Sequence, residues 1–222
     1  MEQDEDNKAH VIALLTANFP VSLWQGLQDR SKLLYMDTFM EAKSDPQINN
    51  SQRLHYLFQR RHFRMENLLQ NEAGQNAIPA NSELIKRNNC FFTLVQKGPV
   101  RMTQSYVRSA GGLPRPAGFR KHLAKQNAFS KQGRLDLIKG ENEFTLPPEV
   151  TGLILHSPAG QSFREEHQAL GAIGFYVPFS DFSGWAVELT FAEIIASYEA
   201  AVEQKDNVVP TIRTVRKTGD AE

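Results

Sequence analysis

The sequence has 222 residues, of which 41% are hydrophobic and 23% are charged, and its formal net charge is zero. This length suits one domain with a sizeable core, and we expect residues 1–222 to form a single domain. No stretch approaches the ~20 apolar residues of a membrane-spanning helix, and the acidic residues 1–6 do not resemble a secretory signal, which starts basic and continues apolar. We therefore expect a cytoplasmic protein without a membrane partner.

The first third of the chain is predicted to be helical. We expect residues 1–7 to be disordered and residues 8–80 to hold three helices, because apolar residues recur there at spacings of three and four. The expected helices are His10–Asn18, Asp29–Lys43 and a third from about Ser51 to Glu72. Proline and glycine residues mark the loops between and after them.

From residue 88 to residue 204 the pattern changes to that of an α+β fold. Runs rich in strand-forming residues, separated by turns, predict strands at residues 89–96, 100–107, 134–138, 143–146, 150–156, 170–178 and 184–190. A short basic helix is expected at Phe119–Phe129 and a C-terminal helix at Phe191–Glu203, followed by a disordered tail over residues 206–222. Hairpins connect these strands, so we expect a helical N-terminal third followed by a mostly antiparallel sheet, an α+β fold.

Cysteine content and motifs exclude several kinds of site. The one cysteine, Cys90, permits no internal disulfide and no zinc site made of several thiolates. Beside Phe91 and Phe92 it is expected to be a buried structural thiol. The motifs Gly-x-Ser-x-Gly, His-Glu-x-x-His and Gly-x-Gly-x-x-Gly are absent, which argues against common hydrolases, metalloproteases and dinucleotide-binding proteins. We expect no metal and no cofactor.

Charge is strongly segregated along the chain. The net charge is −4 over residues 1–50, +12 over residues 51–139 and −8 over residues 140–222. This pattern is typical of a polyanion site or, equally, of a basic part neutralised by the protein's own carboxylates. The candidate nucleic-acid-binding residues are cations of the middle region: Arg53, Arg60, Arg64, Arg101, Arg108, Arg115, Arg120, Lys121, Lys125, Lys131 and Arg134.

Four residues are candidates for catalysis. His55, His62 and Glu66 fall on one side of the third predicted helix, and the last two are four residues apart, a spacing that suits a hydrogen-bonded acid–base pair. With arginines alongside to hold a phosphate, such a pair is the arrangement of a metal-independent ribonuclease. The simpler interpretation is the polar surface of an amphipathic helix. His122, in the basic segment that follows, is the fourth candidate.

Two functions fit these observations. The first is binding of RNA or DNA, extending to a small metal-independent nuclease of the bacterial toxin or phage-defence type, because arginine outnumbers lysine in the basic region and is the better phosphate ligand. The second is a non-enzymatic interaction, inhibitor or immunity-type protein that uses segregated charges to bind a protein partner or a second copy of itself. An exposed basic surface favours the first function, and charges paired within one molecule favour the second.

Overall fold

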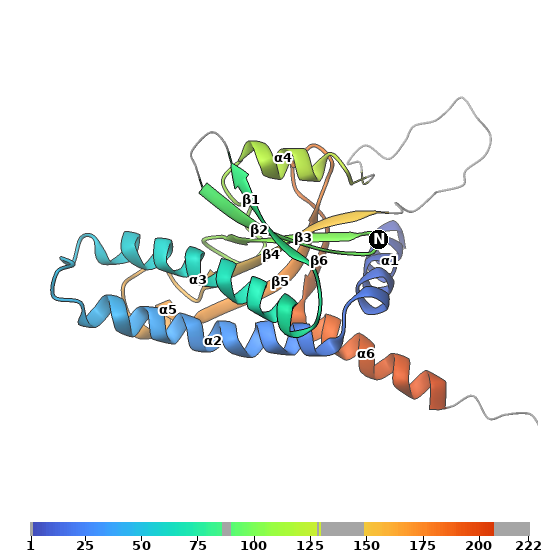
Figure 1. Cartoon of the computed structure of the whole chain (residues 1–222), viewed down its shortest axis with the longest axis horizontal. Helices are drawn as coiled ribbons and strands as arrows, with labels where there is room; N and C mark the ends of the chain where they lie inside the picture. The colour runs from blue at the N-terminus through green and yellow to red at the C-terminus, as the bar shows by residue number, and fades with distance from the viewer. Residues whose placement is uncertain (1, 86–89, 128, 130–148, 207–222) are drawn as a thin grey trace, which may run out of the picture.

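The computed structural model describes residues 2–85, 90–127, 129 and 149–206 (Figure 1). A six-stranded sheet forms the middle layer of the molecule. The long helices cover one face of this sheet, and a short basic helix lies on the other side. The fold is α+β, as the sequence predicts.

Three helices precede the sheet: α1 (Glu2–Asn18), α2 (Val21–Ser44) and α3 (Arg53–Gln75). Pro20 separates the first two, because it cannot continue α1 and stands at the N-cap of α2. Helix α1 begins at Glu2, so the expected disorder over residues 1–7 is wrong for the residues described. Asn7 is buried there, and Lys8 Nζ lies 2.5 Å from Glu193 Oε1, which joins α1 to the C-terminal part of the fold.

Six strands follow chain order across the sheet: β1 (Ala80–Ile85), β2 (Cys90–Lys97), β3 (Val100–Tyr106), β4 (Val150–Pro158), β5 (Leu170–Pro178) and β6 (Trp185–Thr190). All neighbouring pairs are antiparallel except β3 and β4, which are parallel. The prediction of a mostly antiparallel sheet is therefore confirmed. The sequence does not predict β1, because this edge strand is almost wholly exposed and lacks an alternating apolar pattern.

The short basic helix α4 (Gly118–Ala124) ends five residues before the predicted end at Phe129. Asn127 explains the difference, since its buried side chain binds the backbone of neighbouring strands. Its Oδ1 accepts from Thr151 N at 2.7 Å, and its Nδ2 donates to Thr151 O and Pro178 O, both at 2.9 Å. A helical continuation would carry Asn127 away from these partners.

Two helices complete the fold: α5 (Glu165–Gln168), a single turn that the sequence does not predict, and α6 (Phe191–Asp206). Helix α6 begins at the predicted residue because Thr190 and Glu193 form a capping box. Glu193 N donates to Thr190 Oγ1 at 3.2 Å, and Thr190 N donates to Glu193 Oε2 at 2.7 Å. The predicted strands at 134–138 and 143–146, and the tail after residue 206, lie outside the described residues.

Each face of the sheet has its own apolar core. On the helix-covered face, Trp24 packs edge-on against Phe175 at 6.2 Å and against Phe191 at 5.4 Å between ring centroids. A smaller cluster on the opposite face contains Leu153 and Leu155. Alternate residues of a strand point to opposite faces. Along β4, therefore, the helix-covered face continues through residues 150, 152, 154 and 156.

Two expectations about single features can be compared directly with the structure. Cys90 is exposed and not a buried thiol, because it starts β2 beside the exposed edge strand β1. Within the described residues, no helix combines the length and the apolar character required to cross a bilayer.

Candidate functional site

Strands β2 and β3 separate after a short paired segment. Their register joins only Val95–Lys97 to Val100–Met102. Residues Cys90–Val95 of β2 pair with β1, and β3 pairs with β4 along its whole length. Helix α3 packs against both strands, and Phe119 of α4 stacks on Phe92 of β2 with 4.3 Å between ring centroids. We call the place where the two strands separate the β2–β3 split; polar groups there need partners other than a neighbouring strand.

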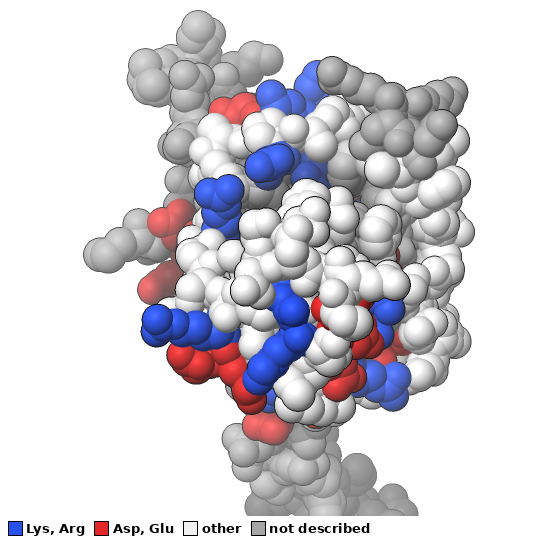
Figure 2. Space-filling view, turned by 90° about the vertical axis from the view of Figure 1, so that its left-hand side faces the viewer, with Lys and Arg blue, Asp and Glu red and all other residues white. Residues whose placement is uncertain are grey.

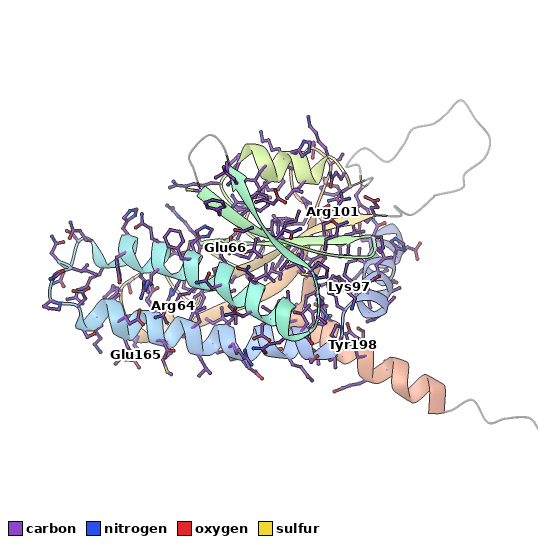
Figure 3. All side chains as sticks on the ribbon, viewed as in Figure 1. Arg64, Glu66, Lys97, Arg101, Glu165 and Tyr198 are labelled. Carbon is purple, nitrogen blue, oxygen red and sulfur yellow. The ribbon has the colours of Figure 1, made fainter. Side chains whose placement is uncertain are left out.

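Glu66 of α3 is a hydrogen-bond acceptor for two of these polar groups. Its buried carboxylate accepts a hydrogen bond from Thr93 N to Oε2 and another from Gln104 Nε2 to Oε1, both at 2.6 Å. Figure 3 shows Glu66 on the side of α3 that faces the sheet. Each carboxylate oxygen therefore has a donor, as a buried charge requires.

Gln104 connects Glu66 to two histidines. Its Nε2 lies 2.9 Å from His62 Nδ1, and its Oε1 lies 3.0 Å from His156 Nε2. His156 is completely buried, and its Nδ1 lies 2.6 Å from the Tyr35 hydroxyl. A continuous hydrogen-bonded chain thus runs from α2 through β4 and β3 to α3.

Burial lowers the pKa of both histidines. Desolvation lowers the pKa of His156 to about 3, with smaller contributions from His62 and Arg61. Desolvation also lowers the pKa of His62 from its ordinary value; Glu66 opposes this shift, and the charge of Arg120 adds to it. Both imidazoles are therefore neutral at pH 7.

Arg61 lies between Tyr35 of the network and Gln168 of α5. Its guanidinium donates to Gln168 Oε1 at 2.8 Å and to Gln168 O at 2.5 Å, and it lies 4.0 Å from the centroid of the Tyr35 ring. Desolvation lowers the pKa of Arg61 to about 10, so the group stays charged at neutral pH. Burial raises the pKa of Tyr35 more than the nearby Arg61 lowers it, which keeps the phenol protonated.

Arg120 reaches this region from α4. Its Nη1 donates to Arg115 O at 3.0 Å, whereas its Nε is buried and has no hydrogen-bond partner among the described residues. Desolvation lowers the pKa of Arg120, and the charge of Glu66 raises it. Arg120 in turn lowers the pKa of His62. The guanidinium therefore acts electrostatically on both His62 and Glu66, although it sits on a different helix.

Tyr106 borders the same network. Its ring packs against Phe58 at 4.9 Å and edge-on against His156 at 5.9 Å between ring centroids. Its hydroxyl is buried and has no hydrogen-bond partner within the described parts of the chain. Burial raises the pKa of this phenol, so Tyr106 is a neutral donor at pH 7.

The structure brings together two of the four predicted catalytic residues. His62 and Glu66 meet at the β2–β3 split, with Gln104 between them in place of a direct acid–base contact. His55 is exposed and binds Gln59 at 3.1 Å on the outer side of α3. His122 is exposed on α4. The histidines at 55 and 122 are therefore not part of the hydrogen-bonded network.

The predicted nucleic-acid-binding arginines of α3 bind groups of α2. Arg60 and Arg64 both pair with Glu41, with 3.2 Å between Arg60 Nε and Glu41 Oε2. Arg53 donates to the carbonyl groups of residues 42 and 43 at the end of α2, the first at 2.6 Å. These contacts stabilise the packing of α2 on α3 and match the second interpretation of the charge pattern, pairing within the molecule.

Apart from Arg120, the remaining predicted cations fall into three groups. Arg101 donates to Gln126 Oε1 at 2.5 Å and lies 3.5 Å from Glu149 Oε2. Four others are exposed, and no carboxylate among the described residues lies within ion-pair distance of them: Arg108, Arg115, Lys121 and Lys125. Lys131 and Arg134 lie outside the described residues.

Figure 2 looks at the end of the molecule where α4 stands above α2 and α3. Toward the top of this view, Lys and Arg side chains form separate patches with few acidic groups among them. Toward the bottom, basic and acidic side chains lie side by side. The basic character of the middle third thus persists as exposed charge around α4 and is largely neutralised around α2 and α3.

Residues that the sequence does not single out complete the site. Tyr35, His156 and Gln104 belong to the hydrogen-bonded chain, and Arg61 and Tyr106 border it. One feature could have pointed to Gln104. The alternation in β3 puts it on the same face as the buried Met102, so a polar side chain is expected in the core there.

No metal site accompanies this network in the part of the chain that is described: no three His, Cys, Asp or Glu side chains gather there as a metal ion would need. Comparison of the chain with models of known protein families, with curated protein sequences and with solved structures found no match.

Proposed function

We propose that this protein binds nucleic acid, with exposed cations on and around α4 contacting the phosphate backbone. The observation that supports the proposal is the contrast among its cations. Arg60 and Arg64 are already paired with Glu41, whereas Lys121 and Lys125 are exposed and have no carboxylate partner among the described residues. Unpaired cations attract phosphates and release the counterions that surround a nucleic acid, which favours binding.

The segment before α4 adds to this surface. Arg108 and Arg115 are exposed, and residues 107–117 form no regular element, so their backbone can follow an irregular ligand. Gly111 has a positive φ of 68°, a conformation that glycine adopts without strain. Arg108 and Arg115 within this loop supply phosphate contacts, and such contacts do not depend on a particular base sequence.

The test measures binding of fluorescently labelled single-stranded RNA and of duplex DNA by anisotropy over a range of salt concentrations. The informative variant is Lys121→Gln/Lys125→Gln. Its matched control is Arg60→Gln/Arg64→Gln, which changes the net charge equally but removes cations that are paired within the protein.

We expect the α4 variant to bind about tenfold more weakly at low salt. Its plot of log affinity against log salt for RNA should be shallower by about 1.4, which corresponds to two lost phosphate contacts. The control should stay within about twofold of the unaltered protein. Absence of binding at low salt, or equal weakening in both variants, would refute the proposal.

A further inference from the structure

We propose that the β2–β3 split holds a site for a phosphate group, in which a neutral His62 and the guanidinium of Arg120 both donate hydrogen bonds. The identity of the phosphate as part of a nucleic acid rests on the function proposed above, but the site itself does not. The argument starts from the buried Glu66 carboxylate and follows the hydrogen bonds outward.

Glu66 determines the orientation of the Gln104 amide. A carboxylate can only accept hydrogen bonds, so the Gln104 atom that lies 2.6 Å from Glu66 Oε1 must be the NH₂ group. The opposite orientation would bring two acceptor oxygens together in a buried place, which costs free energy. Gln104 Oε1 therefore faces His156, and the same NH₂ group faces His62.

The oriented amide then determines the tautomer of each histidine. Gln104 Oε1 requires a donor, so His156 carries its proton on Nε2, and its Nδ1 accepts from the neutral Tyr35 hydroxyl. On the other side, the Gln104 NH₂ group donates to His62 Nδ1. Because His62 is neutral, its one ring proton must lie on Nε2.

All hydrogen bonds of this chain point in one direction, from Tyr35 through His156 and Gln104 to His62. The other ring nitrogen of His62, Nε2, has no hydrogen-bond partner among the described residues and is thereby presented as an N–H donor. This role differs from the acid–base pair of His62 and Glu66 that the sequence suggests, since the basic nitrogen of the ring accepts from Gln104. A neutral imidazole with a fixed N–H group stabilises negative charge on an oxygen atom.

Arg120 supplies the second donor. Its buried Nε has no partner among the described residues, and an unsatisfied guanidinium N–H is costly unless a ligand binds it. Arg120 and His62 are both half-buried, so each keeps part of its surface open to solvent. A tetrahedral phosphate offers several acceptor oxygens and can bind two such donors at once.

The charges around the split permit an anion to enter. The Glu66 carboxylate opposes an anion, but donors occupy both of its oxygens, and the Arg120 guanidinium offsets its charge. Both histidines are neutral, so they contribute neither positive nor negative charge to the split. Exposed Lys121, on the same helix as Arg120, makes the approach to the split positive.

The experiment records long-range ¹H–¹⁵N correlations of the histidine side chains in the full-length, uniformly ¹⁵N-labelled protein. We expect His62 to show a proton on Nε2 and a pyridine-type Nδ1 at pH 7, and to have a pKa lowered from the ordinary value of a histidine. A proton on Nδ1, or a positively charged ring at pH 7, would overturn the proposal. This measurement needs no variant, so it stands even if substitutions in the network prevent folding.

Ligand binding is then followed through the His62 resonances with two probes, inorganic phosphate and a short single-stranded RNA. Arg120→Gln should weaken the response to the bound probe about tenfold or more, because a charge-assisted hydrogen bond is lost. Arg60→Gln, the control of equal charge, should leave it unchanged. A response to RNA alone identifies a backbone phosphate, and a response to inorganic phosphate identifies a free phosphate group.

No response to either probe, or equal loss in both variants, would overturn the site. The outcome is separable from the nucleic-acid proposal. If Lys121→Gln/Lys125→Gln weakens RNA binding about tenfold while inorganic phosphate still shifts His62, both claims hold. If RNA binds but His62 never responds, only the binding function survives.

Discussion

The layer between the helices and the sheet has two halves that are built on opposite principles. In one half, Trp24, Phe175 and Phe191 pack edge to face, and the one polar side-chain atom of these three, Trp24 Nε1, donates to the Tyr198 hydroxyl at 3.1 Å. In the other half, Glu66, Gln104 and His156 are equally removed from water but are held by directional hydrogen bonds. Strand β4 crosses from one half to the other, since Gly152 and Ile154 face the aromatic part and His156 faces the polar one.

The comparison shows which kind of contact determines the orientation of individual side chains. Apolar packing is non-directional, and it rewards volume and shape. In a buried polar network each unmatched donor or acceptor costs free energy, and matched groups determine the orientation of one another. Mutations should therefore destabilise the aromatic half through steric overlap of atoms and the polar half through lost hydrogen bonds.

The largest effect is expected from Gly152→Ala in the aromatic half. A Cβ at this position would lie 2.0 Å from Cζ of Phe175, whose ring has no room to move because it packs on Trp24. We expect a loss of about 3 kcal/mol in the free energy of unfolding, the upper end of the usual cost of overpacking. Denaturant unfolding with a constant m value measures it.

Gly74→Ala is the matched control. Gly74 lies near the end of α3, and nothing stands within 4 Å of the added Cβ. This substitution should stabilise the protein by about 0.5–1 kcal/mol, because alanine is the better helix former. If Gly152→Ala were as well tolerated as Gly74→Ala, the close contact of β4 with the Phe175 ring would be wrong.

The outline of the fold could be predicted from the sequence, but the packing of neither half of the layer could. The expected second helix starts at Asp29, whereas α2 starts at Val21 and carries Trp24 into the aromatic half. Hydropathy and spacing locate α3 and β5 because they report burial of single elements. They also place His62 and Glu66 on one side of α3, which the structure bears out. They do not tell which side meets the sheet, nor that Gln104 of another element stands between the two residues.

The parallel pairing of β3 with β4 shows the same limit. It brings Gln104 beside Ile154 and Tyr106 beside His156, although more than forty residues separate the partners in each pair. No local pattern encodes such a register. A polar residue at a core position of β3 is visible in the sequence, but its partners depend on the tertiary arrangement.

An intermediate effect is expected from Gln104→Leu in the polar half. Leucine is similar in size, so packing changes little, but Glu66 Oε1 loses its donor and His156 Nε2 loses its acceptor. A cost of about 2 kcal/mol follows from leaving such buried groups unsatisfied. Gln59→Leu serves as the control, since Gln59 binds His55 on the exposed side of α3, and it should change stability by less than about 0.5 kcal/mol. Equal, small effects of both substitutions would show that the network contributes little to stability.

The effect most diagnostic of the polar half is its dependence on pH. In the unfolded chain His156 has an ordinary pKa of about 6.5, whereas in the folded protein burial lowers its pKa to about 3. Between these values the unfolded state binds the extra proton, so stability rises with pH. The contribution of the neutral histidine is fully present above about pH 6.5 and is lost as the pH falls toward 3.

This single group contributes a slope of about 1.4 kcal/mol per pH unit well below pH 6.5. His62, whose pKa is also lowered, adds a slope of the same sign. His156→Gln should lower stability at pH 7, because the hydrogen bond to Tyr35 is disturbed. Between pH 4 and 6 it should also reduce the slope of unfolding free energy against pH by about 1.4 kcal/mol per pH unit. Unfolding free energies measured at several pH values compare the slopes directly. If the variant and the unaltered protein lost stability in parallel as the pH fell, His156 would not be the buried neutral group that joins the two halves of the core.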